Sequence, residues 1–132
     1  MAHSFSHRIE VRFRDCDPLG HVNNAVYLTY LEQARLFHWR TLWGFGLNTS
    51  SSVPGVIMAR AEIDFKKQVT YGEALEVTIT VAAVGRTSFT YDYAILNEAG
   101  EVVASARTVQ VMYDYGTGRP TPIPDDIRAK LQ

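Results

Sequence analysis

The first regular pattern of hydrophobic and polar positions is a strict alternation along Arg8 to Arg14. Its apolar members, Ile9, Val11 and Phe13, alternate with charged residues. Successive side chains of a strand point to opposite faces, so this period of two predicts a half-buried β-strand. An Asp-Pro pair and a Leu-Gly pair follow, and they predict that the strand ends there.

A different pattern covers Asn24 to about Trp43, where apolar side chains occupy most of the circumference of a helix. The predicted helix is roughly 30 Å long at 1.5 Å per residue. A helix that is apolar on most sides must be enclosed by other elements. Asn23 is a suitable N-cap for this helix, and Gly44 or Gly46 is a suitable stop.

Four further strands are predicted after the helix, over about 57–65, 75–81, 89–95 and 102–113. The last of them alternates poorly, which is typical of a strand covered on both faces. Residues 97–100 have the composition of a hairpin turn. Residues 116–124 are rich in Gly and Pro and predict an irregular segment, and 125–131 predict a short closing helix.

The order of strand, helix and then consecutive strands with short turns predicts an antiparallel sheet. One largely apolar helix and a single sheet to cover it predict an α+β fold in which the sheet wraps around the helix. No repeat or linker divides the chain, so residues 1–132 are expected to form one domain. Such a sheet leaves an edge exposed, and pairing with a second copy predicts a homodimer, or a homotetramer built as a dimer of dimers.

The charge and the composition of the chain exclude several classes of function. The formal net charge is -1, so no overall field favours nucleic acid or an anionic membrane. The single cysteine, Cys16, cannot form an intrachain disulfide, which fits a reducing compartment. The sequence has neither a signal-peptide pattern nor an apolar run long enough to span a membrane, and a cytoplasmic location is expected.

The turn between the first strand and the helix, Asp15 to Asn24, carries the candidate chemistry. It brings carboxylates, an imidazole, a glycine and two asparagines to the start of an apolar helix. A carboxylate at the positive end of a helix can act as acid, base or nucleophile, while free backbone N–H groups hold an oxyanion. This combination predicts acyl transfer.

The run from Arg12 to Leu28, RFRDCDPLGHVNNAVYL, followed by LEQAR at 31–35, resembles the 4-hydroxybenzoyl-CoA thioesterase family of hotdog-fold enzymes. The resemblance covers nearly the whole chain. It implies a helix wrapped by an antiparallel sheet, cleavage of acyl-CoA thioesters, and a dimer or tetramer without a metal. The archetypal member has aromatic residues where this chain has Asn23 and Asn24, and the HVNN version is more similar to fatty acyl-CoA members.

The resemblance also implies roles for individual residues. Asp17 matches the family's catalytic carboxylate, as nucleophile or as general base for water. Asn24 matches the position whose backbone N–H polarises the thioester carbonyl. Glu32 falls where the archetype places an acidic residue against the substrate hydroxyl.

Three further residues of this region are candidates on their own chemistry. His21 could be a general base or could orient Asp17 or a water, and a supporting turn histidine is the competing interpretation. Gly20 is expected to permit a turn with positive φ and close approach of the substrate. Tyr27 lies one turn into the helix and could line the acyl site. Asp15 is expected at the surface, and Cys16 is not expected to be a nucleophile, because no base is indicated beside it.

The turn Arg86-Thr87-Ser88 resembles the family's basic turn that contacts the CoA phosphates. Arg86 supplies charge and Ser88 a hydroxyl, whereas a solvated turn arginine is the alternative. The histidines at 3, 7, 21 and 38 lack the spacing of zinc ligands, and no phosphate-loop or dinucleotide fingerprint is present, so no metal or cofactor is expected.

The sequence therefore predicts an acyl-CoA thioesterase that releases a free acid, a fatty acid in the favoured interpretation, and CoA. Two alternatives stay open. The donor could be an acyl carrier protein, or the chain could bind acyl-CoA without catalysis.

Overall fold

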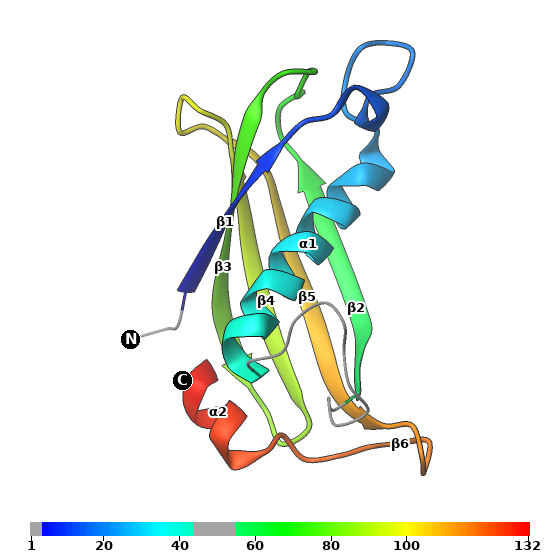
Figure 1. The fold of residues 1–132 in the computed structure, drawn as a ribbon, viewed down its shortest axis with the longest axis vertical. Helices are drawn as coiled ribbons and strands as arrows, with labels where there is room; N and C mark the ends of the chain where they lie inside the picture. The colour runs from blue at the N-terminus through cyan, green and yellow to red at the C-terminus, as the bar shows by residue number, and fades with distance from the viewer. Residues whose placement is uncertain (1–3, 44–54) are drawn as a thin grey trace.

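The computed structural model describes residues 4–43 and 55–132 (Figure 1). The elements in chain order are β1 (Ser4–Glu10), a 3₁₀ turn (Phe13–Asp15), α1 (Asn24–Trp43), β2 (Gly55–Phe65), β3 (Ala74–Val84), β4 (Ser88–Leu96), β5 (Val102–Asp114), β6 (Arg119–Pro120) and α2 (Asp125–Leu131).

The strands form one antiparallel sheet in the order β1-β3-β4-β5-β2, with the short β6 paired to β5. The long α1 lies across one face of this sheet, and α2 lies near the C-terminal end of α1 (Figure 1). Lys130 of α2 donates from Nζ to the carbonyl of Leu42 at 2.7 Å, which ties the two helices together. The predicted α+β architecture is confirmed.

The core lies between α1 and the sheet. Along β4 the burial alternates without a break, and Phe89, Tyr91, Tyr93 and Ile95 face the core. On the helix side of the core, the buried residues of α1 include Leu31, Ala34, His38 and Leu42. The period-two and helical patterns therefore identified these faces correctly.

The first strand begins and ends earlier than its alternation predicted. β1 covers Ser4–Glu10, and the chain turns after Val11, so that Phe13 is 79% exposed. The cause is local, because the backbone N–H and the guanidinium of Arg12 both donate to Asp15 and close the 3₁₀ turn. Asp15 was expected at the surface but is 2% exposed.

The bounds of the predicted helix are confirmed, whereas its predicted enclosure on most sides is wrong for the single chain. The face turned away from the sheet is open, and Leu28 is 44% exposed. Asn23 caps the helix as predicted, since its Oδ1 accepts from the N–H of Ala25 at 3.0 Å. The predicted stops at Gly44 and Gly46 lie outside the described residues.

β2 forms one edge of the sheet. It pairs with β5 only, and within the described ranges no strand covers its other edge. Met58 and Phe65 on this strand are 43% and 46% exposed.

The poor alternation of β5 has two sources. A register shift against β4, where Ile95 pairs with Ala104 and Leu96 with Val102, interrupts it near the start of the strand. Farther along, polar Thr108 and Gln110 occupy buried positions, while Val109 and Val111 are half-buried. Cover on both faces is therefore not needed to explain it.

Candidate active site

The turn before α1 is a miniature hairpin. Cys16 and Val22 form an antiparallel bridge, and the N–H of Asp17 donates to the carbonyl of His21 at 2.8 Å. The N–H of Gly20 donates to the carbonyl of Asp17 at 3.0 Å, and Gly20 has φ of 87°, a conformation that favours glycine. The predicted positive φ at Gly20 is confirmed.

This hairpin is held against the chain that follows β2. The N–H of Val22 donates to the carbonyl of Val69 at 2.8 Å, and His21 forms an antiparallel bridge with Thr70. The loop therefore has backbone contacts on both sides, which fixes its position against the start of α1.

The carboxylate of Asp15 connects the turn to α1 through hydrogen bonds from both. Its Oδ2 accepts from the hydroxyl of Tyr30 at 2.8 Å and from the N–H of Arg12 at 2.9 Å, and its Oδ1 accepts from Nη2 of Arg12 at 2.9 Å. Burial alone would raise the pKa of Asp15, but the hydrogen bonds from Arg12 and Tyr30 outweigh it and hold that pKa below its ordinary value. Asp15 is therefore ionised and has a structural role, since both of its oxygens accept hydrogen bonds from Arg12 or Tyr30.

Asp17 differs from Asp15 in having a free oxygen. Its Oδ1 accepts from the N–H of Leu19 at 2.9 Å and from the N–H of His21 at 3.4 Å. Its Oδ2 accepts no hydrogen bond from residues 4–43 or 55–132. The two backbone donors orient the carboxylate and leave one oxygen for a substrate or a water.

Asp17 faces a hollow of about 330 Å³ at the start of α1. Its lining consists of Asp17, Leu19, His21, Val22, Asn24, Tyr27, Phe65, Lys66, Lys67 and Gln68. Four of the predicted site residues, Asp17, His21, Asn24 and Tyr27, thus come together here. Gly20 is not a lining residue, although Leu19 and His21 on either side of it are.

Asn24 is the first residue of α1, and its backbone N–H has no acceptor in the described part of the chain. The first N–H groups of a helix lack partners within the helix, and the macrodipole places partial positive charge there. The N–H of Asn24 can therefore donate to an oxygen that enters the hollow.

Tyr27 forms an apolar wall of the hollow with Phe65. Their rings lie edge to face with centroids 5.1 Å apart. Burial, and after it the charges of Glu73 and Cys16, raise the pKa of Tyr27, so its phenol stays neutral at ordinary pH. It can line an acyl group but does not supply a negative charge.

Phe65, Lys66 and Lys67 were missed by sequence reasoning. They end β2 and continue past it, and the only signal was a pair of lysines directly after a predicted strand. Lys67 pairs with Glu101 at 2.7 Å. Lys66 has no ion pair among the described residues, so its charge is available at the mouth of the hollow.

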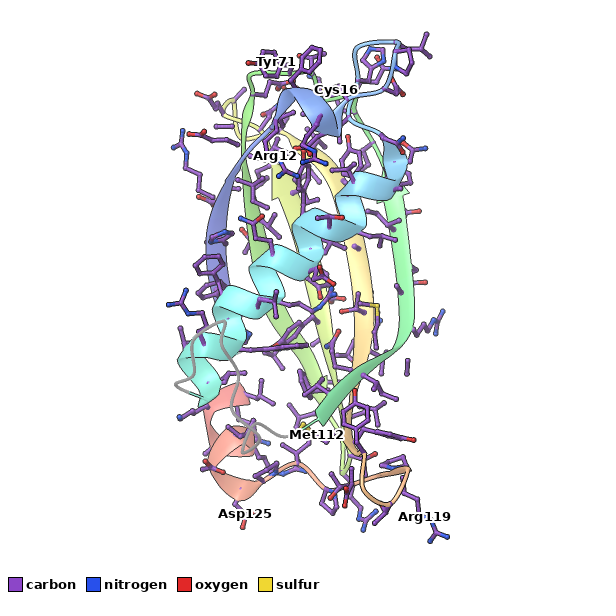
Figure 2. The ribbon with its side chains drawn as sticks, turned by 45° about the vertical axis from the view of Figure 1, so that its right-hand side comes forward. Arg12, Cys16, Tyr71, Met112, Arg119 and Asp125 are labelled. Carbon is purple, nitrogen blue, oxygen red and sulfur yellow. The ribbon has the colours of Figure 1, made fainter. Side chains whose placement is uncertain are left out.

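Other predicted residues lie elsewhere. Glu32 lines a separate hollow farther along α1. The turn of Arg86, Thr87 and Ser88 joins β3 to β4 at the opposite end of the molecule from the start of α1 (Figure 1). The carbonyl of Thr87 accepts from the N–H of Met112 at 2.8 Å, and Figure 2 shows Met112 far from Arg12 and Cys16. One chain therefore does not bring Arg86 to Asp17.

The described residues contain no cluster of three or more His, Cys, Asp or Glu side chains that could hold a metal ion. Within the same ranges, no helix is both long enough and apolar enough to cross a lipid bilayer. Cys16 is half-buried, and its thiol donates to the carbonyl of Arg12 at 3.9 Å.

Known proteins resemble this chain over nearly its full length. A family described as the thioesterase-like superfamily matches residues 11–131. The 1,4-dihydroxy-2-naphthoyl-CoA hydrolase of Synechococcus elongatus is 30% identical over 125 residues, which cover 92% of this chain and 90% of the relative. The long-chain acyl-CoA thioesterase FadM of Escherichia coli strain K12 is 27% identical over 126 residues, 95% of each chain.

A solved structure gives the same fold. The thioesterase from Thermus thermophilus, complexed with coenzyme A and Zn, is 34% identical to this chain. The two structures agree with a TM-score of 0.83, over 96% of each chain.

Proposed function

The chain belongs to the thioesterase-like superfamily, has its hotdog fold and is a hydrolase of acyl-CoA thioesters, and we propose that Asp17 is the catalytic carboxylate of this reaction. The narrower kinship with the 4-hydroxybenzoyl-CoA thioesterases is part of the proposal and is supported by the turn motif RFRDCDPLGHVNN.

One observation carries the assignment. Asp17, whose Oδ2 accepts no hydrogen bond from the described residues, and Asn24, whose N–H has no acceptor among them, border the same hollow. Hydrolysis of a thioester needs a group that attacks or activates water on one side of the carbonyl carbon and a donor that stabilises the developing oxyanion. The hollow provides both groups, and both are fixed by backbone hydrogen bonds.

Two routes fit this arrangement. As a general base, Asp17 takes a proton from water, and the resulting hydroxide attacks the thioester carbon while the N–H of Asn24 holds the oxyanion. The intermediate collapses and expels the CoA thiolate, which then takes up a proton. As a nucleophile, Asp17 attacks the carbon itself, expels the thiolate and forms a mixed anhydride, which water then hydrolyses. His21 borders the hollow and orients the water in either route.

We propose a fatty acyl group as the substrate. The wall made by Tyr27 and Phe65 is apolar, and the relative from Escherichia coli is named a long-chain acyl-CoA thioesterase. The relative from Synechococcus elongatus is named for an aromatic substrate. Comparing kcat/KM for palmitoyl-CoA and benzoyl-CoA tests the preference, and a higher value for benzoyl-CoA would contradict it.

We also propose that the protein is a homodimer, or a dimer of dimers, assembled on the open side of β2 and α1. Support comes from the unpaired edge of β2 and from the exposed apolar side chains Leu28, Met58 and Phe65. The second copy would bring its own turn of Arg86, Thr87 and Ser88 toward the CoA phosphates.

A thiol-release assay over a series of acyl-CoA chain lengths tests the function. Wild type is expected to release CoA, and Asp17→Asn to lose at least about a hundredfold in kcat. Wild-type turnover by Asp17→Asn would remove Asp17 from the mechanism. Faster release from acyl carrier protein thioesters would favour that donor instead, and binding without thiol release would favour a noncatalytic acyl-CoA binding protein.

A further inference from the structure

A second hollow lies between α1 and β2, toward the C-terminal half of the helix. Its volume is about 400 Å³, within the range of small-molecule sites. Its lining consists of Glu32, Arg35, Leu36, Trp39, Val56, Met58 and Gln110. The hydrolase reaction described above uses none of its polar groups.

Arg35 is the unusual member of this lining because it is 5% exposed and has no counter-charge among the described residues. Its Nη1 donates to the hydroxyl of Tyr93 at 3.2 Å. No Asp or Glu of residues 4–43 or 55–132 forms an ion pair with it. Residues 44–54 contain no acidic side chain in the sequence, so they cannot supply one. Arginine is seldom buried this far without an anionic partner.

The neighbouring polar groups are already satisfied by one another. The hydroxyl of Tyr93 lies 2.6 Å from that of Thr108, and Thr108 donates to Oε1 of Gln110. The Nε2 of Gln110 donates to the carbonyl of Phe89 at 3.1 Å. These bonds fix the floor of the hollow and leave most of the guanidinium N–H groups of Arg35 without an acceptor in the described ranges.

Exposed apolar side chains of α1 and β2 lie between this hollow and the one beside Asp17. Asn24, Leu28 and Glu32 are four residues apart and share a face of α1. On β2, Phe65 borders the first hollow and Met58 the second. Leu28, Met58 and Phe65 are all partly exposed in the single chain, and in the proposed dimer the second copy would cover them together with the acyl chain. From Asn24 to Arg35 the distance along the helix is about 16 Å, at 1.5 Å per residue.

We propose that Arg35 binds a carboxylate at the far end of the acyl chain, so that the substrate class is an acyl-CoA with an ω-carboxylate. The direction of the chain rests on the proposed function, which places the thioester between Asp17 and Asn24. A guanidinium binds a carboxylate through two parallel hydrogen bonds, and here the pair would form away from water. Glu32, the acidic group on the same wall, is exposed, and solvent screens its charge.

Binding tests this proposal without catalysis. The probes are two non-hydrolysable CoA thioethers of equal length, one with a dodecyl chain and one with the same chain ending in a carboxylate. Calorimetry on wild type is expected to give a dissociation constant about tenfold lower for the carboxylate probe. Arg35→Met is expected to lose this preference, and Arg35→Lys to keep part of it. Arg119→Met, which removes an exposed arginine on β6 that lines neither hollow, is expected to keep it fully.

Equal binding of the two probes by wild type would overturn the proposal, and so would a preference that survives in Arg35→Met. If Arg35→Met does not fold, a third probe with an ω-ammonium group decides on wild type alone, because Arg35 must reject it. Equal binding of the ammonium and carboxylate probes would contradict the assignment.

Thiol release from the matching thioesters separates this proposal from the hydrolase function. If wild type binds the carboxylate probe more tightly but releases thiol from neither thioester, the Arg35 site stands and the hydrolase function fails. If wild type hydrolyses both thioesters with equal kcat/KM and binds both probes equally, the hydrolase stands and the Arg35 proposal fails.

Discussion

Asp15 and Asp17 show how environment gives neighbouring carboxylates different tasks. Asp15 is buried, and both of its oxygens accept hydrogen bonds from Arg12 or Tyr30. Asp17 keeps one oxygen without a donor among the described residues and borders a hollow. The first carboxylate is therefore suited to stabilise the turn, and the second to react.

Replacing Asp15 with Asn is expected to lower the free energy of unfolding by about 2–4 kcal/mol, because it breaks a buried charged network and leaves donors of Arg12 and Tyr30 poorly paired. Urea denaturation measures the change. Asp17→Asn is the matched control, and it should lose activity while keeping most of its stability. Similar stability losses in the two variants would contradict the division of tasks.

The contribution of Asp15 also sets a pH dependence. Its pKa is lower in the folded chain than in the unfolded chain, so the ionised form favours folding. The contribution is fully present above the unfolded pKa of about 3.9 and is lost as the pH falls through the lower folded pKa. The stability difference between wild type and Asp15→Asn should therefore be constant near neutral pH and shrink below about pH 4.

Lys66 and Lys67 offer a second matched pair of variants at the mouth of the first hollow. Lys66 has no ion pair in the part of the chain that the structure describes, whereas Lys67 is paired with Glu101. Lys66→Ala is therefore expected to raise KM for acyl-CoA by about three- to tenfold, through loss of attraction to the CoA phosphates. Lys67→Ala should change KM less. The effect of Lys66→Ala should fall with added salt, and an effect that does not depend on salt would point to a packing role.

At the scale of elements, the turn that carries Asp17 depends on a backbone conformation at Gly20. A Cβ at Gly20 would meet nothing within 4 Å, so the strain of an alanine there comes from its φ of 87° alone. Gly20→Ala is expected to lower stability by about 1 kcal/mol and to lower kcat, because relieving the strain moves Asp17.

Gly100 provides the control for Gly20. It has φ of 81°, is equally free of steric contacts, and lies in the hairpin between β4 and β5. Gly100→Ala should therefore cost about the same stability, about 1 kcal/mol, while kcat stays unchanged. Thermal unfolding and steady-state kinetics on both variants make the comparison. Equal kcat in the two variants would show that the geometry of the Asp17 turn does not limit the reaction.

The elements that sequence reasoning located well are those whose periodic pattern is long and whose neighbours lie close in sequence. α1 and the consecutive strands β3, β4 and β5 meet both conditions, and their bounds agree with the prediction to within three residues. β1 did not, because the Arg12–Asp15 interaction ended the strand inside an alternating run. Alternation reports which face a side chain would occupy, and a local hydrogen-bonded turn can override it.

The candidate site was predictable in part for a similar reason. Asp17, His21, Asn24 and Tyr27 come from one continuous segment, so a single motif could identify them. Phe65 and Lys66, at the C-terminal end of β2, line the same hollow only because β2 packs beside the start of α1. No local sequence pattern predicts that contact. The buried state of Arg35 likewise depends on the side chains of β4 and β5 beneath it.

At the scale of the whole molecule, the predicted substrate contacts form two groups, the Asp17 turn and the Arg86 turn, which lie at opposite ends of the chain's fold. β3 spans about 35 Å at roughly 3.3 Å per residue and separates the Asp17 turn from the Arg86 turn. The proposed dimer resolves this separation only if the Arg86 of one copy serves the Asp17 of the other. That arrangement makes each site depend on both chains.

Mixed dimers test this dependence directly. A dimer purified from differently tagged Asp17→Asn and Arg86→Ala chains has one copy with an intact Asp17 and one with an intact Arg86. If the site is shared between copies, one of its two sites is wild type, and about half of the wild-type kcat should appear with the wild-type KM. If each chain contains its whole site, the Asp17→Asn half is inactive and the other half keeps the raised KM of Arg86→Ala. The KM of the mixed dimer therefore decides between the two arrangements, and a protein that stays monomeric at all concentrations would contradict the shared site.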